Sequence, residues 1–412
     1  MMTGADLVVY ADELLTCSPG NSLKRGGAMM DVGLVRNGAV VVSDGRILEI
    51  GDASSIRGRY MAEKTVETIM AMPCLVDAHT HPIFAGSRIH EYEMRAQGAS
   101  YLEIMESGGG IAGTVRATRK ASDEELFNSM YERLTRMLKH GTGWVEAKSG
   151  YGLSLEEELR QLRIIRKVGE SHPVGVVSTF LGAHAIPEEY AGKRGKYVDL
   201  VCNGMIPAVA EEGLADFVDV FCEDGAFDFD ETERIFNAAI DKGLKIRIHS
   251  EQFKSSGASL KAAMMGAYSC DHLLGLSLED AKRIADYDTV CMFLPSSEFF
   301  LNVRKYGLMR EAIDCGAAVG LATDFNAGSC LSESLPMTMS IAVIQMKIHP
   351  EEAVLAATSN AAWSIGKGAV AGCLEPGRPA DILCVDCGYR EWLYHFGVNM
   401  ISGVVKGGKL YV

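Results

Sequence analysis

The middle of the chain alternates strand-like apolar runs with amphipathic helical segments, and the number of these runs constrains the fold most. Eight consecutive βα units are the number that closes a parallel barrel, and closure leaves no exposed strand edge. A doubly wound open sheet would need a glycine-rich turn directly after a strand, and the cluster Gly108-Gly109-Gly110 follows none. We therefore predict a (β/α)8 TIM-like barrel over residues 73–371. Its eight strand candidates are residues 74–79, 143–148, 174–184, 217–223, 245–250, 268–273, 289–295 and 318–325.

Two of the intervening helices have recognisable starts. Ser122 with Glu125, and Ser154 with Glu157, fit the capping box, in which a hydroxyl and a carboxylate satisfy free backbone N–H groups. Gly141 is expected to end the first of these helices.

The two ends of the chain have a different, β-rich pattern. Residues 6–15, 38–52 and 65–73 read as strands, with Asp44-Gly45 as a hairpin turn, and residues 380–387 and 400–412 repeat this style around Gly407-Gly408. We predict that residues 1–72 and 372–412 together form a small β-sandwich domain.

Composition excludes several classes of protein. The formal net charge of −14 argues against binding to nucleic acid or to anionic membranes, which requires a basic surface. No apolar stretch is long enough to span a membrane, and MMTGADLVVYADEL lacks the order of a signal peptide, so a cytoplasmic location is expected. The 11 cysteines are scattered, and Cys384 and Cys387 lie in an alternating apolar segment, so reduced, buried cysteines are predicted.

Histidine and aspartate side chains recur where the barrel strands are predicted to end. His79 and His81 lie two residues apart, so a strand presents both imidazoles on one face. The ends of four other strands carry His184, His249, His272 and Asp324. Catalytic groups of barrel enzymes lie at this edge, and convergence from separate strands indicates a shared ligand. The remaining histidines are interpreted as solvated residues: His90, His140, His172, His349 and His395.

Three imidazoles and one carboxylate from this set would suit one Zn²⁺ or Fe ion. Such an ion lowers the pKa of a coordinated water to about 7, which predicts hydrolysis. The fourth strand ends in Glu223 rather than in a lysine that could carry a bridging carbamate, so a single ion is favoured.

Several longer motifs carry a family resemblance over nearly the whole chain. They are HTHPIFAGSR, ESGGGI, AKSGYGL, TFLGAHAIP, DVFCE, CDHL, ATDFNAGS and FGVN. With these motifs the chain resembles the amidohydrolase superfamily. Within it, the chain is similar to the enzymes that hydrolyse 4-imidazolone-5-propanoate to N-formimino-L-glutamate in histidine degradation. The segments HSEQFKSSG and MFLPSSEFFL depart from the family pattern and bear on fine substrate preference.

The resemblance implies a role for each residue of the site. It implies catalysis by His272, as the polarising and proton-transfer partner of the metal-bound water, and by Asp324, which receives the water proton and later delivers it to the leaving ring nitrogen. Strand alternation, by contrast, predicts that Asp271 faces away from His272 and has a structural role. Arg88 offers a planar fork for the substrate carboxylate, and Tyr151 a hydroxyl donor. The implied metal ligands are His79, His81, His249 and Asp324, and the implied substrate contacts are Arg88, Tyr151, His184, Gln252, Asn326, Gly328 and Ser329.

Gln252 helps to distinguish between the alternative enzymatic activities. Deaminases of the superfamily carry a glutamate three residues after the histidine of the fifth strand, and an amide cannot shuttle that proton. Glu251 is adjacent, so another amidohydrolase that acts on a related cyclic amide or deaminates a nucleobase-like ring stays open. A non-catalytic barrel would have lost a ligand, and none is missing. The expected partner is a small, carboxylate-bearing cyclic amide, and a symmetric homodimer is an assembly that such barrels commonly form.

Overall fold

A computed structural model describes residues 2–18, 22–98 and 109–412 of the chain. Eight strands form one sheet in the order β12-β11-β10-β9-β8-β7-β6-β5, and every neighbouring pair is parallel. No strand extends more than one residue beyond the run expected from the sequence, although β11 and β12 are shorter than their runs. The strands are β5 (Leu75–Thr80), β6 (Thr142–Lys148), β7 (Gly175–Ala183), β8 (Phe217–Cys222), β9 (Lys245–Ser250), β10 (Ser269–His272), β11 (Val290–Phe293) and β12 (Ala318–Leu321).

The first and last strands of this sheet meet along a short seam. The backbone N–H of His81 donates to the carbonyl of Phe325 at 2.8 Å, and Thr80 and Phe325 form a parallel bridge. Asp77 accepts hydrogen bonds from the backbone N–H and the hydroxyl of Thr323, at 3.0 and 2.7 Å. The barrel predicted from the strand count is therefore confirmed.

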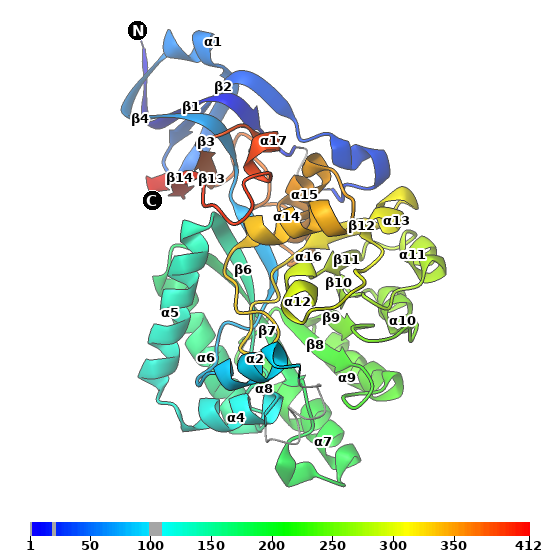
Figure 1. Ribbon diagram of the computed structural model, residues 1–412. Helices are drawn as coiled ribbons and strands as arrows, with labels where there is room; N and C mark the ends of the chain where they lie inside the picture. The colour runs from blue at the N-terminus through cyan, green and yellow to red at the C-terminus, as the bar shows by residue number, and fades with distance from the viewer. Residues whose placement is uncertain (1, 19–21, 99–108) are drawn as a thin grey trace.

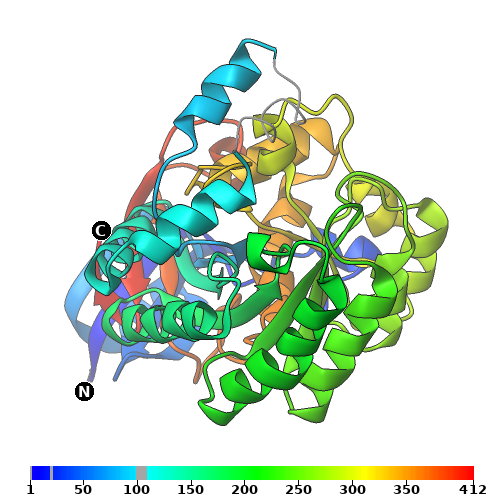
Figure 2. The same cartoon turned by 90° about the horizontal axis from the view of Figure 1, so that it is seen from below.

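Helices lie around the strands (Figure 2). Ser122 and Glu125 form the predicted capping box, and Gly141 takes a positive φ of 85° just after the helix that they start. At the second predicted box, the Ser154 hydroxyl accepts from the N–H of Glu157. The helices of the barrel region are α2 (Ile89–Ala96), α4 (Ile111–Lys120), α5 (Asp123–Lys139), α6 (Leu155–Ser171), η2 (Glu188–Tyr190), α7 (Arg194–Leu200), η3 (Val201–Met205), α8 (Ile206–Glu211), α9 (Phe229–Asp241), α10 (Ala258–Met264), α11 (Leu278–Ile284), α12 (Pro295–Phe300), α13 (Met309–Asp314), α14 (Leu335–Gln345), α15 (Pro350–Ala356) and α16 (Ser359–Ser364).

The two chain ends build a second sheet on one side of the barrel, with both termini close to it (Figure 1). Its seven strands follow the order β15-β14-β13-β4-β1-β2-β3. The elements of the two chain ends are β1 (Thr3–Leu15), η1 (Gly26–Met30), which packs against α13 and α15 of the barrel, β2 (Leu34–Ser43), β3 (Arg46–Asp52), α1 (Ala53–Arg57), β4 (Tyr60–Pro73), β13 (Ile382–Val385), α17 (Tyr389–Trp392), β14 (Ile401–Lys406) and β15 (Lys409–Leu410).

The opposite ends of this seven-stranded sheet touch each other. Asp44 and Gly45 both take positive φ, 52° and 73°, as the predicted hairpin turn requires. The carbonyl of Gly45 accepts from Ala380, and the carbonyl of Ala380 accepts from Gly408, at 2.9 and 3.2 Å. Side chains of both halves pack into one buried cluster, which includes Val40 and Val405. The sheet therefore encloses its own small core, as expected for a β domain made from both termini.

The cysteines and the helices agree with what the composition of the chain predicts. All 11 cysteines are free, and Cys384 and Cys387 are buried as predicted. No helix among the described residues is both long and apolar enough to cross a membrane.

Candidate active site

The barrel strands bring the predicted histidines and Asp324 together at one rim. Nε2 of His79 and Nε2 of His81 lie 3.6 and 3.7 Å from Oδ1 of Asp324. Nε2 of His249 lies 3.3 Å from Nε2 of His81. All four side chains are almost entirely buried.

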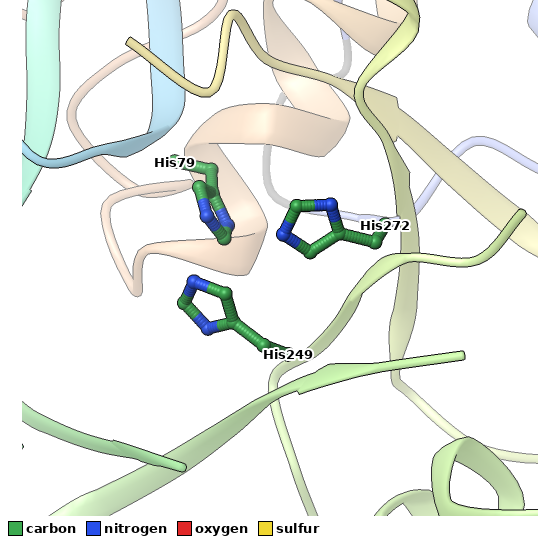
Figure 3. Close-up of side chains that lie close together, drawn as sticks. All are labelled: His79, His249 and His272. Carbon is green, nitrogen blue, oxygen red and sulfur yellow. The ribbon is translucent and has the colours of Figure 1, made fainter. Parts of the chain in front are cut away.

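These side chains form two overlapping groups whose ligand atoms are close enough to hold one ion. One group is His79, His81 and Asp324, and the other is His79, His249 and His272. Figure 3 shows the three imidazoles of the second group facing one another. His272 therefore lies against His79 and His249, two of the ligands predicted from the sequence.

The chemistry of these donor atoms fits a divalent metal ion. Nε2 of His79 is buried and has no hydrogen-bond partner among the described residues, while its Nδ1 lies 2.8 Å from a carboxylate oxygen of Asp271. Since a carboxylate only accepts, Nδ1 carries the proton and Nε2 keeps a free lone pair. Burial lowers the pKa of His79 and of His81 well below the usual histidine value, so both rings are neutral. Four ligand atoms about 2.0–2.1 Å from a tetrahedral ion lie about 3.3 Å apart, close to the separations above.

A buried network of charged side chains lies beneath these histidines. Nζ of Lys148 donates to Oε1 of Glu146 and to Oδ2 of Asp219, both at 2.8 Å, and all three side chains are fully buried. Oδ2 of Asp219 in turn lies 2.9 Å from Nδ1 of His249. Burial alone would raise the pKa of Asp219, but His249, Lys148 and Arg247 lower it well below its usual value. Asp219 is therefore a carboxylate that fixes the orientation of His249.

Arg247 helps to fix the orientation of His79. Its Nη2 donates to Oδ2 of Asp271 at 2.8 Å and to the carbonyl of Ala78 at 2.7 Å. The same Asp271 oxygen contacts His79, so the guanidinium orients the carboxylate that orients the imidazole.

Asp271 is not among the described residues that line the pocket, and its carboxylate supports His79 from behind. Asp271 contacts His79, and the next residue, His272, lines the pocket. His272 takes a φ of 83°, and Leu273 a φ of 65°, conformations that are rare for residues with a side chain. The two successive residues therefore serve the site from different sides, with Asp271 behind His79 and His272 at the pocket.

One pocket extends from these histidines to Arg88. It is lined by all seven of the substrate-contact residues predicted from the sequence. His184 receives its orientation from the carbonyl of Gly150, which lies 3.0 Å from Nδ1. Burial lowers the pKa of His184 to about 3, so the ring is neutral and Nε2 is its acceptor. His81 and His184 stack on each other with ring centroids 5.3 Å apart, and Tyr151 packs against both, with ring centroids 6.1 and 5.3 Å away.

The loop after β12 surrounds Asp324. Oδ1 of Asn326 accepts from the N–H groups of Gly328 and Ser329, at 2.7 and 2.8 Å. The Ser329 hydroxyl donates to Oδ2 of Asp324 at 3.2 Å. Burial raises the pKa of Asp324 to about 6, above the usual aspartate value.

Arg88 lies at the other end of the pocket. Its Nε and Nη2 donate to the two carboxylate oxygens of Glu91, at 2.8 and 2.6 Å. Its guanidinium packs directly on Gly328, where a Cβ atom would lie only 1.9 Å from Nη1. The absence of a side chain at Gly328 therefore makes room for Arg88.

Gln252 lines the pocket and Glu251 does not. Glu251 is fully buried, and its Oε1 accepts from the N–H groups of Ser256 and Gly257 at 3.1 and 2.9 Å. Its other carboxylate oxygen accepts from the hydroxyl of Ser259. Glu251 thus supports the segment before α10, and the pocket has an amide where a deaminase would need a carboxylic acid.

Sequence reasoning missed the charged residues behind and beside the site. The available signal was charge inside strands that are otherwise apolar: Glu146 and Lys148 share one strand face, as do Arg247 and His249. His172 was wrongly assigned to solvent. It is buried, and its Nδ1 accepts from the N–H of Val174 at 3.1 Å. Residues 106–108 of the ESGGGI run lie outside the described residues.

A parallel barrel with a β domain from both termini, and histidines and an aspartate at the carboxyl ends of its strands, defines the amidohydrolase class of enzymes. The model of the amidohydrolase family matches residues 303–411. Solved structures with this fold include a zinc-bound adenosine deaminase from Xanthomonas campestris, with a TM-score of 0.71 and 17% identity over 100% of this chain and 93% of that one. Another is the zinc complex of atrazine chlorohydrolase from Arthrobacter aurescens TC1, with a TM-score of 0.72 and 17% identity over 98% of this chain and 95% of that one.

Relatives with higher sequence identity show which family of this class includes the chain. The imidazolonepropionase of Geobacillus kaustophilus is 44% identical over 93% of this chain and 92% of its own length. That of Parabacteroides distasonis is 41% identical over 98% of both chains. The chain belongs to the imidazolonepropionase family.

Proposed function

We propose that this protein hydrolyses the ring C–N bond of 4-imidazolone-5-propanoate to give N-formimino-L-glutamate, a step of histidine degradation. The observation that carries the proposal is a single pocket, in a chain of this family, that joins a histidine–aspartate cluster at one end to Arg88 at the other. This arrangement matches a substrate that has a hydrolysable ring at one end and a carboxylate at the other. The enzyme would act in the cytoplasm.

His79, His81, His249 and Asp324 would hold one Zn²⁺ or Fe ion per chain. Such an ion supplies hydrolytic chemistry by lowering the pKa of a water molecule to about 7 and by polarising a carbonyl group. Arg88 binds the propanoate, and His184 and Gln252 hold the polar edges of the ring. Together they place the ring carbonyl carbon beside His272 and Asp324.

The side chains then carry the proton. Asp324 takes a proton from the attacking water through a carboxylate oxygen, and the new C–O bond forms at the ring carbonyl carbon. His272 is neutral, because burial lowers its pKa to about 3, and its N–H can stabilise the developing oxyanion. Asp324 returns the proton to the ring nitrogen as the C–N bond breaks, which leaves a carboxylate and the formimino group.

Incubation of the purified protein with 4-imidazolone-5-propanoate tests the proposal. We expect loss of the ultraviolet absorbance of the ring, formation of N-formimino-L-glutamate by mass spectrometry, and loss of both signals after chelation of the metal. Metal analysis of the active protein distinguishes zinc from iron. Ammonia release without ring opening would instead establish a deaminase and overturn the proposal.

Arg88→Ala should raise the KM for this substrate by about 10- to 100-fold, the effect of losing a hydrogen-bonded charge. Metal content should stay at the wild-type level, because Arg88 contacts Glu91 and Gly328 rather than the histidines. Steady-state kinetics and metal analysis of the same preparation measure both quantities. An unchanged KM would remove Arg88 from the substrate site.

A further inference from the structure

A second arginine, Arg95, lines the same end of the pocket as Arg88. Both side chains belong to one short segment: Arg88 precedes α2, and Arg95 lies in its last turn. Nη2 of Arg95 donates to the carbonyl of Gly328 at 2.9 Å, and Gly328 is the residue on which Arg88 packs. The two guanidinium groups therefore approach the same glycine.

The hydrogen bonds of the two arginines leave donors free. Nε and Nη2 of Arg88 donate to the carboxylate of Glu91, and Nη2 of Arg95 donates to the carbonyl of Gly328. Within the described part of the chain, Nη1 of Arg88 and Nη1 of Arg95 have no hydrogen-bond acceptor, and neither does Nε of Arg95, which is buried. Of these donors, Nε of Arg95 is the one found among the buried atoms without a partner in the described residues, and it costs free energy unless a ligand supplies its acceptor.

The charges at this end of the pocket also favour the binding of an anion. Two guanidinium groups and the carboxylate of Glu91 give this end of the pocket a net charge of +1. Burial is the main cause that lowers the pKa of Arg95. Glu91 raises this pKa and Arg88 lowers it further, so Arg95 lies near both of the other charges. One bound carboxylate would neutralise the excess charge and accept from both arginines.

We propose that Arg95 is a further substrate-binding residue, which together with Arg88 clamps the carboxylate of the substrate, while Glu91 positions Arg88. This inference rests on the proposed function, and it adds a specificity determinant to it. Arg95 selects ligands that carry a carboxylate at this distance from the ring over equivalent neutral ones.

The test compares Arg95→Met with Arg95→Lys and with Arg36→Met, a control in which the arginine is exposed on the terminal sheet and pairs with Glu13. Isothermal titration measures binding of two probes to the metal-loaded enzyme, 3-(imidazol-4-yl)propanoate and its uncharged propanamide. We expect Arg95→Met to lose about 10- to 100-fold in affinity for the propanoate and little for the propanamide. Arg95→Lys should fall between this variant and the wild type, and Arg36→Met should match the wild type.

The pair of probes separates binding of the carboxylate from a purely structural role. Loss of the Gly328 contact alone would distort the loop and weaken both probes equally, and that result would overturn the proposal, as would unchanged affinity for the propanoate. In kinetics with 4-imidazolone-5-propanoate, Arg95→Met should raise KM and leave kcat and metal content near wild type. If the wild-type enzyme does not turn over this substrate, the proposed function fails, and the ratio of probe affinities still decides the role of Arg95.

Discussion

Asp324→Asn is expected to lower kcat for 4-imidazolone-5-propanoate by roughly 1,000-fold, within the range of about 100- to 10,000-fold attributed to a positioned acid–base group. The carboxylate is the only acidic side chain close to the Nε2 atoms of both His79 and His81 among the described residues. An asparagine amide fills the same space, but it neither takes the water proton nor returns it to the ring nitrogen.

The same variant should also bind metal more weakly, because a neutral amide replaces an anionic ligand. Metal analysis after dialysis against a weak chelator, followed by kinetics with excess metal, separates the two losses. Asp288→Asn is a matched control, since this carboxylate is exposed and pairs with Arg25 at 3.1 Å. Retention of a tenth of the wild-type kcat at full metal loading would exclude Asp324 as the proton carrier.

Lys148→Met is expected to have the second large effect, a loss of about 3–5 kcal/mol in the free energy of unfolding. The ammonium group lies between Glu146 and Asp219 with no solvent exposure, so its removal leaves two carboxylates buried beside each other with less compensation. Among the described residues, the guanidinium of Arg247 would then be the nearest remaining cation to both carboxylates, at 3.6 and 3.9 Å.

This destabilisation should reach the metal site through Asp219 and His249. We expect weaker metal binding as well as a lower urea midpoint, both measured on protein stripped of metal and then titrated with it. Lys64→Met, on an exposed position of β4, controls for the loss of one positive charge. A variant as stable as the wild type, with the same metal affinity, would show that the buried ammonium does not support the site.

The fold was largely predictable because its signals are local. Apolar runs, capping residues and the Asp44-Gly45 turn each act within a few residues, and backbone geometry translates them directly into strands, helix starts and hairpins. Counting the runs then gave the barrel, and the barrel placed the strand ends on one rim. The histidines of the site followed from that position alone.

Side-chain contacts between residues of different strands were harder to predict from the sequence. Lys148 and Asp219 are 71 residues apart in the chain, and Arg247 and Ala78 are 169 apart. A charged residue inside a strand signals an unusual environment, but its partner depends on which strands become neighbours and on their register. The positive φ of His272 is equally invisible in the sequence, since most residues with a side chain avoid it.

The sequence by itself determined the parallel barrel, the β domain made by both chain ends, and the convergence of histidines and Asp324 on one rim. These features depend on periodicity and on the direction of strands. The tertiary structure alone decided which nitrogen of His79 and of His184 keeps a free lone pair, that Asp271 supports His79, that Glu251 is structural, and that Arg95 lies beside Arg88. Each of these depends on contacts between segments that are distant in the chain, and only the packed fold brings such segments within hydrogen-bond distance.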